Sequence, residues 1–105
     1  MNFGDYQIEA AKTAIYTDRN YPALGLAEES GELLGIIAKA VRDNRGQLTV
    51  TDIARFQKEA GDVLWMLAMV CMEYGINLQE VAELNVFKLR DRQSRGVLGG
   101  RGDDR

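Results

Sequence analysis

Five carboxylates are concentrated in two segments of the chain, and their spacing suggests a metal site. They are Glu28, Glu29, Glu32, Glu59 and Asp62. Each residue of a helix advances by about 100°, so residues three apart share a face. Five carboxylates on two facing helices would repel one another, and a divalent cation is the simplest ligand that relieves this repulsion. The pattern therefore predicts two neighbouring helices that bind a cation between them.

The apolar neighbours of two of these carboxylates favour a buried site. On a helical projection, Glu29 lies between Ile36 and Ala40. Glu59 likewise projects among apolar side chains, including Met66. Glutamate pairs at helical spacing commonly form a solvated face, but a buried carboxylate is expensive unless it is paired or binds metal. The apolar surroundings therefore favour the metal site over the solvated face.

The absence of histidine restricts the metal and the chemistry. The 105-residue chain has no histidine and a single cysteine, Cys71, which lies in an apolar run and is expected in the core. The usual zinc sites, Ser-His and Cys-His nucleophile pairs, and the Glu-x-x-His repeats of di-iron bundles are thereby excluded. Ligands that are all oxygen atoms favour Mg²⁺, with Mn²⁺ as a substitute.

A polar stripe nearer the C-terminus has the composition of a phosphate site. Asn85, Lys88 and Arg92 stand at i, i+3 and i+7 in a segment of helical periodicity. Lys88 would supply a point charge, and Arg92 a planar fork of donors. Basic residues are also common near helix C-termini because they interact favourably with the helix dipole. Beside a carboxylate metal site, however, the stripe would complete what a polyphosphate needs.

The elements that position these side chains are predicted to be helices. Hydrophobic periodicity is helical almost throughout, without a convincing strand, and indicates an all-α fold of four helices. The second begins after Pro22, Thr49 or Thr51 can cap the third, and Asn77 can cap the fourth. The expected ranges are 5–16, 24–43, 49–74 and 77–95. Residues 1–95 would form one domain, followed by a glycine-rich tail over residues 96–105.

Composition and charge exclude further classes of function. A net charge of −3 leaves no basic surplus to bind a nucleic-acid polymer. No signal peptide is visible, and the longest apolar run, residues 63–72, is too short to cross a membrane, so we expect a cytoplasmic protein. The same run is apolar on nearly every side. It therefore predicts that a second copy covers part of it, in a homodimer or homotetramer.

Taken together, the motifs resemble one family. The run Leu24-Gly-Leu-Ala-Glu-Glu-Ser-Gly-Glu-Leu33, followed after a spacer by Lys58-Glu-Ala-Gly-Asp-Val-Leu-Trp65, resembles the Glu-Glu-x-x-Glu…Glu-x-x-Asp signature of MazG-type nucleoside triphosphate pyrophosphohydrolases. The 26 residues between Glu32 and Glu59 fit the family's spacing. Residues 85–96 resemble the family's downstream stretch, and the tail 99–105 is similar to that of its short stand-alone members. The resemblance covers about residues 20–105 and is specific in combination.

This resemblance implies a four-helix MazG-like bundle whose two central helices carry the metal site. The implied reaction is the Mg²⁺-dependent hydrolysis of a nucleoside triphosphate to the monophosphate and pyrophosphate by an activated water. Carried over by position, the metal ligands would be Glu29, Glu32, Glu59 and Asp62. Glu28 would be a further ligand or a base that orients water. The phosphates would be held by Asn85, Lys88 and Arg92.

The residues leave the base and the exact reaction open. Trp65, one turn after Asp62, could stack on a base, although an aromatic residue in an apolar helix more often belongs to the core. A related all-α phosphohydrolase, dUTPase-like or acting on phosphoribosyl-ATP, would share the metal chemistry and differ in substrate. A non-catalytic helical interaction module could keep the metal site for stability alone.

Overall fold

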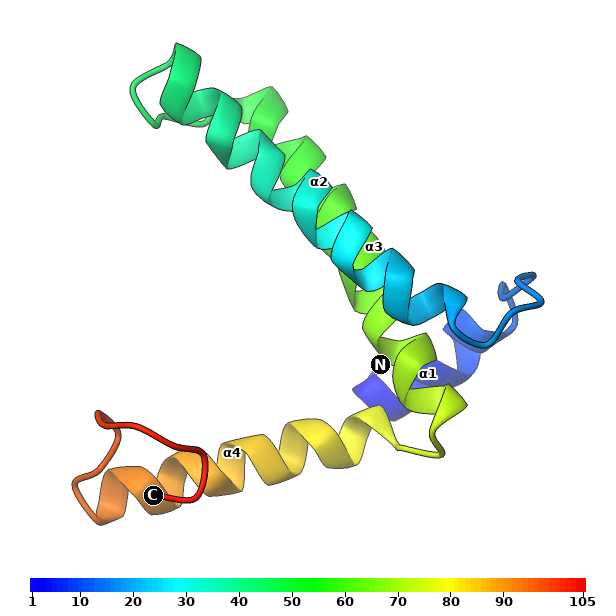
Figure 1. Ribbon diagram of the computed structural model, residues 1–105, viewed down its shortest axis with the longest axis vertical. Helices are drawn as coiled ribbons and strands as arrows, with labels where there is room; N and C mark the ends of the chain where they lie inside the picture. The colour runs from blue at the N-terminus through cyan, green and yellow to red at the C-terminus, as the bar shows by residue number, and fades with distance from the viewer.

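The computed structural model describes residues 1–105, which form four helices and no strand. The helices are α1 (Phe3–Ala11), α2 (Tyr21–Asp43), α3 (Val50–Glu73) and α4 (Leu78–Ser94). Helices α2 and α3 pair as a long hairpin, α1 packs at one end of it, and α4 extends away to give a V-shaped outline (Figure 1). The all-α prediction is confirmed. None of the helices combines the length and apolar character needed to cross a membrane.

Side-chain capping bonds set the starts of α3 and α4, and a proline marks the start of α2, all close to where the sequence predicts them. The Thr49 hydroxyl accepts the backbone N–H of Asp52, and the Asp52 carboxylate accepts the N–H of Thr49, which forms a capping box for α3. Pro22 lies in the first turn of α2, where a missing N–H is tolerated. The Asn77 side chain accepts two backbone N–H groups at the start of α4.

The first helix begins earlier and ends sooner than the sequence pattern indicates. Its N-cap is Asn2, and it ends at Ala11 rather than at Tyr16. The Thr13 hydroxyl donates at 2.7 Å to a carbonyl one turn earlier, a local bond of the kind that favours helix ends over helix interiors. Tyr16 consequently lies in the α1–α2 loop, where its ring packs edge-on against Trp65.

The core lies where α1 packs on the C-terminal half of α3. Its buried members are Ala10, Ala68, Met69, Cys71 and Leu78. Along the rest of the hairpin only one side of α2 is covered, so Ile36 is buried while Val41 is 64% exposed. The Cα radius of gyration is 16.7 Å, against roughly 13 Å for a compact chain of this length. A single chain therefore leaves much apolar surface uncovered.

A glycine lets the hairpin helices approach closely beside the carboxylates. Gly25 is buried, and a Cβ atom built there would lie 2.6 Å from the terminal atoms of Met66. Gly25 lies one turn before Glu29, and Met66 one turn after Asp62. Because only glycine fits this contact without displacing Met66, the sequence brings α2 and α3 together at the level of their acidic residues.

Candidate functional site

Three of the predicted carboxylates meet between α2 and α3. One oxygen atom from each of Glu29, Glu59 and Asp62 lies within 4.8 Å of the other two. Glu29 and Glu59 are half-buried, and Asp62 is exposed. The group therefore has a buried side, formed by one glutamate from each helix, and a side that solvent or a ligand can reach.

The buried side of this acidic cluster lacks hydrogen-bond donors. Glu29 Oε2 and Glu59 Oε2 are buried without any partner, and no ion pair of the chain involves a residue of the cluster. Burial, the negative charges of Glu32, Asp62 and Glu59, and the close approach of the Glu29 and Glu59 carboxyl groups raise the pKa of Glu29 to about 7. Orphaned buried carboxylates are unfavourable. A cation bound by these oxygen atoms would remove both the repulsion and the missing contacts.

The other two predicted carboxylates lie at the margin of the cluster. Glu32 is exposed, yet it is close enough for its charge to raise the pKa of Glu29. Glu28 is exposed and is not part of the group of three. Because Glu28 and Glu29 are consecutive in a helix, their side chains diverge by about 100°. Glu32 can thus join the cluster directly, whereas Glu28 points beside it.

An aromatic pocket opens at the α1–α2 loop, next to the part of α3 that follows Asp62. Its volume is about 480 Å³, and its lining residues are Thr13, Ile15, Tyr16, Thr17, Asp18, Tyr21 and Trp65. The indole N–H of Trp65 donates to the Thr13 hydroxyl at 2.9 Å, which fixes the ring. Tyr16 lies 6.2 Å from Trp65 and 5.7 Å from Tyr21, measured between ring centroids. The structure therefore makes Trp65 a wall of this aromatic pocket.

Tyr16 lines the pocket, although the helical pattern predicts it as the last residue of the first helix. Its hydroxyl donates to Glu73 Oε1 at 2.7 Å. Burial, this hydrogen bond and the charge of Glu73 raise the pKa of Tyr16 to about 12. The ring is therefore tied to α3 although its backbone belongs to a loop. The only sequence signal was the run of Thr, Asp and Asn that follows Tyr16, which is typical of loops.

The polar stripe lies on α4, apart from the acidic cluster. Helix α4, which carries the stripe, packs against α1 and diverges from the hairpin that carries the carboxylates (Figure 1). Asn85 is exposed, Lys88 is half-exposed, and Arg92 is only 5% exposed. The three residues share a helix as predicted, but they differ greatly in access to a ligand.

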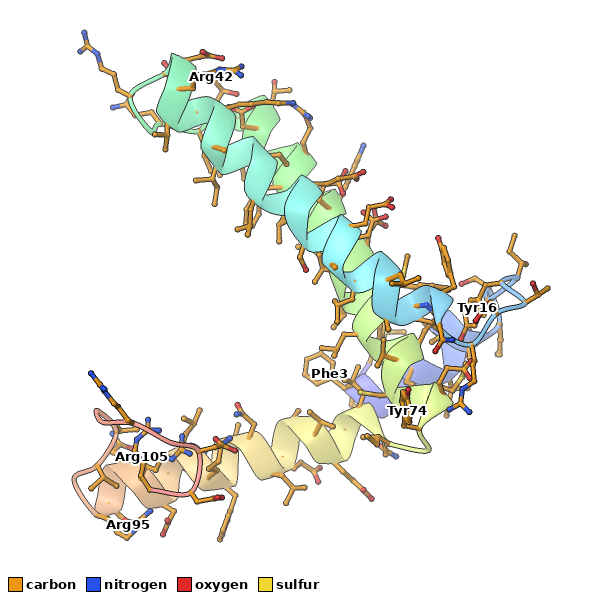
Figure 2. All side chains as sticks on the ribbon, viewed as in Figure 1. Phe3, Tyr16, Arg42, Tyr74, Arg95 and Arg105 are labelled. Atoms are coloured by element: carbon orange, nitrogen blue, oxygen red, sulfur yellow. The ribbon has the colours of Figure 1, made fainter.

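The C-terminal tail covers part of this stripe. Residues 96–105 turn back over the end of α4, where Figure 2 shows Arg105 beside the helix. Asp103 Oδ1 accepts hydrogen bonds from Lys88 Nζ at 2.8 Å and from Arg92 Nη2 at 2.9 Å. Hydrogen bonds and charge from these two cations lower the pKa of Asp103. A glycine-rich composition gives no signal for such an ordered contact, and the sequence did not predict it.

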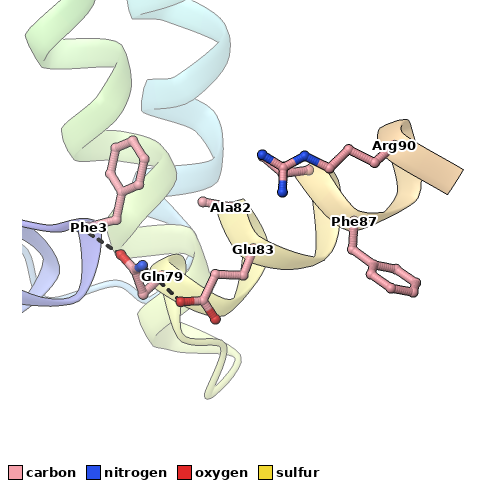
Figure 3. A pocket seen from close by; sticks show the side chains of 7 residues that line it. Phe3, Gln79, Ala82, Glu83, Phe87 and Arg90 are labelled. Carbon is pink, nitrogen blue, oxygen red and sulfur yellow. Dashed lines mark hydrogen bonds between the residues drawn. The ribbon is translucent and has the colours of Figure 1, made fainter. Parts of the chain in front are cut away.

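A groove lies in the angle between α1 and α4, away from the acidic cluster (Figure 3). Gln79 closes one end of it by accepting the N–H of Phe3 at 3.0 Å and donating to Glu83 at 3.0 Å. Val86 and Phe87 contribute apolar lining, and Phe87 is 72% exposed. The groove has a volume of about 470 Å³ and no cluster of metal-ligating groups. The groove is therefore suited to packing against another apolar surface.

Comparison with known proteins identifies one family. The sequence model of the MazG nucleotide pyrophosphohydrolase domain matches residues 20–97, which include every acidic and basic residue of the predicted site. The chain is also 35% identical over 114 aligned positions to the Gene 37 protein of Mycobacterium phage L5, with 100% of both chains covered. No solved structure matches the chain.

Proposed function

The chain belongs to the MazG nucleotide pyrophosphohydrolase family, and we propose that it hydrolyses ribo- or deoxynucleoside triphosphates to monophosphates and pyrophosphate in a Mg²⁺-dependent reaction. The supporting observation is the pair of buried, unpartnered oxygen atoms on Glu29 and Glu59, with Asp62 beside them. Carboxylates that only stabilised the fold would be expected to have donors. An all-oxygen group without donors suits Mg²⁺ or Mn²⁺.

The proposed ligands for the cation are Glu29, Glu32, Glu59 and Asp62. When bound, Mg²⁺ would neutralise triphosphate charge and polarise the phosphoryl oxygens. The half-buried pair is fixed by the contact between α2 and α3, while Asp62 and Glu32 face the solvent from which a triphosphate enters. Glu28, exposed at the margin, is our candidate for orienting the water that attacks phosphorus.

The aromatic pocket is our candidate for the base subsite. Trp65 lies one helical turn beyond Asp62, so a base beside Trp65 would leave the ribose to span the distance to phosphates at the cluster. The hydrogen bond to Thr13 holds the indole in place before any ligand arrives. Stacking on Trp65 and Tyr21 would accept any base, because every base has an aromatic face.

A second copy of the chain is needed to bring the basic stripe to the carboxylates, and we propose a homodimer or a homotetramer built from such dimers. Helix α4 exposes 68% of Leu84 and 72% of Phe87, and the groove of Figure 3 adds apolar surface. Packing of α4 against the hairpin of another copy would cover this surface. The same contact would carry Lys88 of one chain toward the acidic cluster of its partner.

A screen of nucleoside triphosphates with Mg²⁺ tests this function. We expect equal amounts of monophosphate and pyrophosphate, with turnover lost in chelator and restored by Mg²⁺ or Mn²⁺. Release of orthophosphate, or turnover that chelator leaves unchanged, would contradict the proposal. Hydrolysis of dUTP alone, or of phosphoribosyl-ATP alone, would assign the chain to one of the related phosphohydrolases. Metal-dependent stabilisation without any turnover would indicate a non-catalytic module.

A further inference from the structure

The C-terminal segment is a folded lobe held by its own hydrogen bonds. We call residues 96–105 the C-terminal lobe. Arg105 donates from Nε to the carbonyl of Val97 at 3.1 Å and from Nη2 to the carbonyl of Leu98 at 2.9 Å. Arg95, just after α4, donates to the Arg105 carbonyl at 2.6 Å. The two ends of the lobe are therefore tied to each other and to the end of α4.

Two glycines give this lobe its shape. Gly100 and Gly102 have φ values of +119° and +83°, which side chains with a Cβ atom rarely adopt. A Cβ atom at Gly100 would also lie 3.2 Å from the Arg105 side chain. The chain can therefore turn tightly enough here to return Asp103 to the surface of α4.

Asp103 divides the two cations of the stripe into different roles. Arg92, which is 5% exposed, donates to both the side chain and the backbone carbonyl of Asp103, so it anchors the lobe and presents little surface to a ligand. The Lys88 side chain remains 39% exposed. Its ammonium group has three donors, and Asp103 accepts from one of them. Two cations face one carboxylate, so these three side chains together keep a net positive charge.

We propose that Asp103 is a positioning residue, which holds Lys88 in the orientation that binds the phosphates of the nucleotide. The inference rests on the proposed function, because that function makes a triphosphate the ligand of Lys88. A free lysine side chain loses conformational entropy when it binds an anion, and an ion pair formed beforehand removes part of that loss. The lobe, which the sequence indicated only as a tail, would thereby belong to the substrate site.

Asparagine in place of Asp103 provides the test, and the neighbouring residue provides a matched control. Asp103→Asn keeps the shape and removes the charge, Asp103→Glu keeps the charge, and Asp104→Asn alters an exposed carboxylate that has no ion pair. We expect Asp103→Asn to raise both KM for the preferred nucleotide and Kd for inorganic tripolyphosphate by roughly fivefold, with little change in kcat. Asp103→Glu should recover part of the affinity, and Asp104→Asn should match the unaltered chain.

A double-mutant cycle separates positioning from a general structural effect. In a Lys88→Ala background, Asp103→Asn should cause no further loss of tripolyphosphate affinity. An unchanged Kd in Asp103→Asn, with or without a lower melting temperature, would overturn the inference, and so would tighter binding. Tripolyphosphate is bound without being a nucleotide substrate. If no nucleotide is hydrolysed but Kd responds as expected, the proposed function fails and the positioning role stands.

Discussion

The α2–α3 hairpin differs from α4 and its C-terminal lobe in whether charged side chains have partners within the chain. In the hairpin, Glu29 and Glu59 each have a buried oxygen atom without a partner. On α4, Lys88 and Arg92 are paired within the chain by Asp103, and only Arg92 Nε is buried without a partner. Unpaired buried charge destabilises a fold until a ligand compensates it, whereas an internal ion pair orders its members in advance. In the proposed function a cation would compensate the hairpin carboxylates, whereas the cations of α4 are already ordered within the chain.

The largest effect should follow from altering the accessible side of the hairpin cluster. Asp62→Asn keeps the shape and removes one proposed ligand charge, so we expect kcat/KM to fall at least about 100-fold. Asp91→Asn is the control, because it removes an aspartate of α4 whose exposed ion pair with Arg95 lies outside the cluster. Turnover is measured for both variants at saturating Mg²⁺. Equal losses in both would mean that the hairpin carboxylates have no special role.

A second, smaller effect should follow from weakening the proposed contact between α4 of one copy and the hairpin of another. Phe87→Ser removes the most exposed large apolar side chain of α4, so we expect a shift toward monomer in light scattering and a loss of turnover of about tenfold or more. Val41→Ser is the comparison variant, because it also replaces an exposed apolar residue, 64% exposed, but lies on α2 and not on α4. A monomeric chain with full activity would show that one copy contains the complete site.

The pH dependence of stability tests the acidic cluster of the hairpin, whose buried oxygen atoms have no partners within the chain. The pKa of Glu29 is raised from 4.5 to about 7, so the folded chain holds a proton in this range that the unfolded chain has released. The free energy of unfolding of metal-free protein should therefore fall as pH rises from about 4.5 to 7 and then level off. Urea unfolding at a series of pH values measures this slope, and Glu29→Gln should flatten it. A free energy of unfolding that rises over this pH range would contradict like-charge repulsion among the hairpin carboxylates.

The smallest effect is expected for Lys88 on α4, which Asp103 already pairs within the chain. Lys88→Ala should raise KM for the nucleotide by roughly tenfold or less and leave the far-UV circular dichroism unchanged, because Lys88 is half-exposed and Arg92 still anchors the lobe. Steady-state kinetics and the dichroism spectrum are measured together. Unchanged kinetics would reduce the stripe to a solvated face of α4.

Much of the fold could be predicted because short-range signals determine it. Helical periodicity and the cap residues Thr49 and Asn77 set the helices of the hairpin and the start of α4. The end of α1 was wrong because the hydrogen bond of Thr13 competes with the helix, and periodicity does not register such bonds. The direction of α4 depends on packing against other helices, and no local pattern in residues 78–94 specifies it.

The candidate site could be predicted only where its residues follow helical spacing. The proximity of Glu29, Glu59 and Asp62 follows from two amphipathic helices that face each other. The contact of Asp103 with Lys88 and Arg92 depends instead on a glycine-rich turn, whose path no periodicity encodes. Tyr16 reaches the pocket through loop geometry in the same way. Sequence reasoning therefore predicted which helical residues lie together and missed the contacts that loops make.

The charge of Glu59 offers the most direct test of the account, because this residue supplies half of the unpaired buried oxygens. Turnover and melting temperature would be measured for the unaltered chain and for Glu59→Gln, each with Mg²⁺ and with chelator. We expect Mg²⁺ to raise the melting temperature of the unaltered chain, and Glu59→Gln to lose most activity and most of that rise. The metal-free variant should be at least as stable as the metal-free parent, because one repelling charge is gone. Full activity in Glu59→Gln, with lower stability both with and without Mg²⁺, would show instead that the carboxylate only supports the fold.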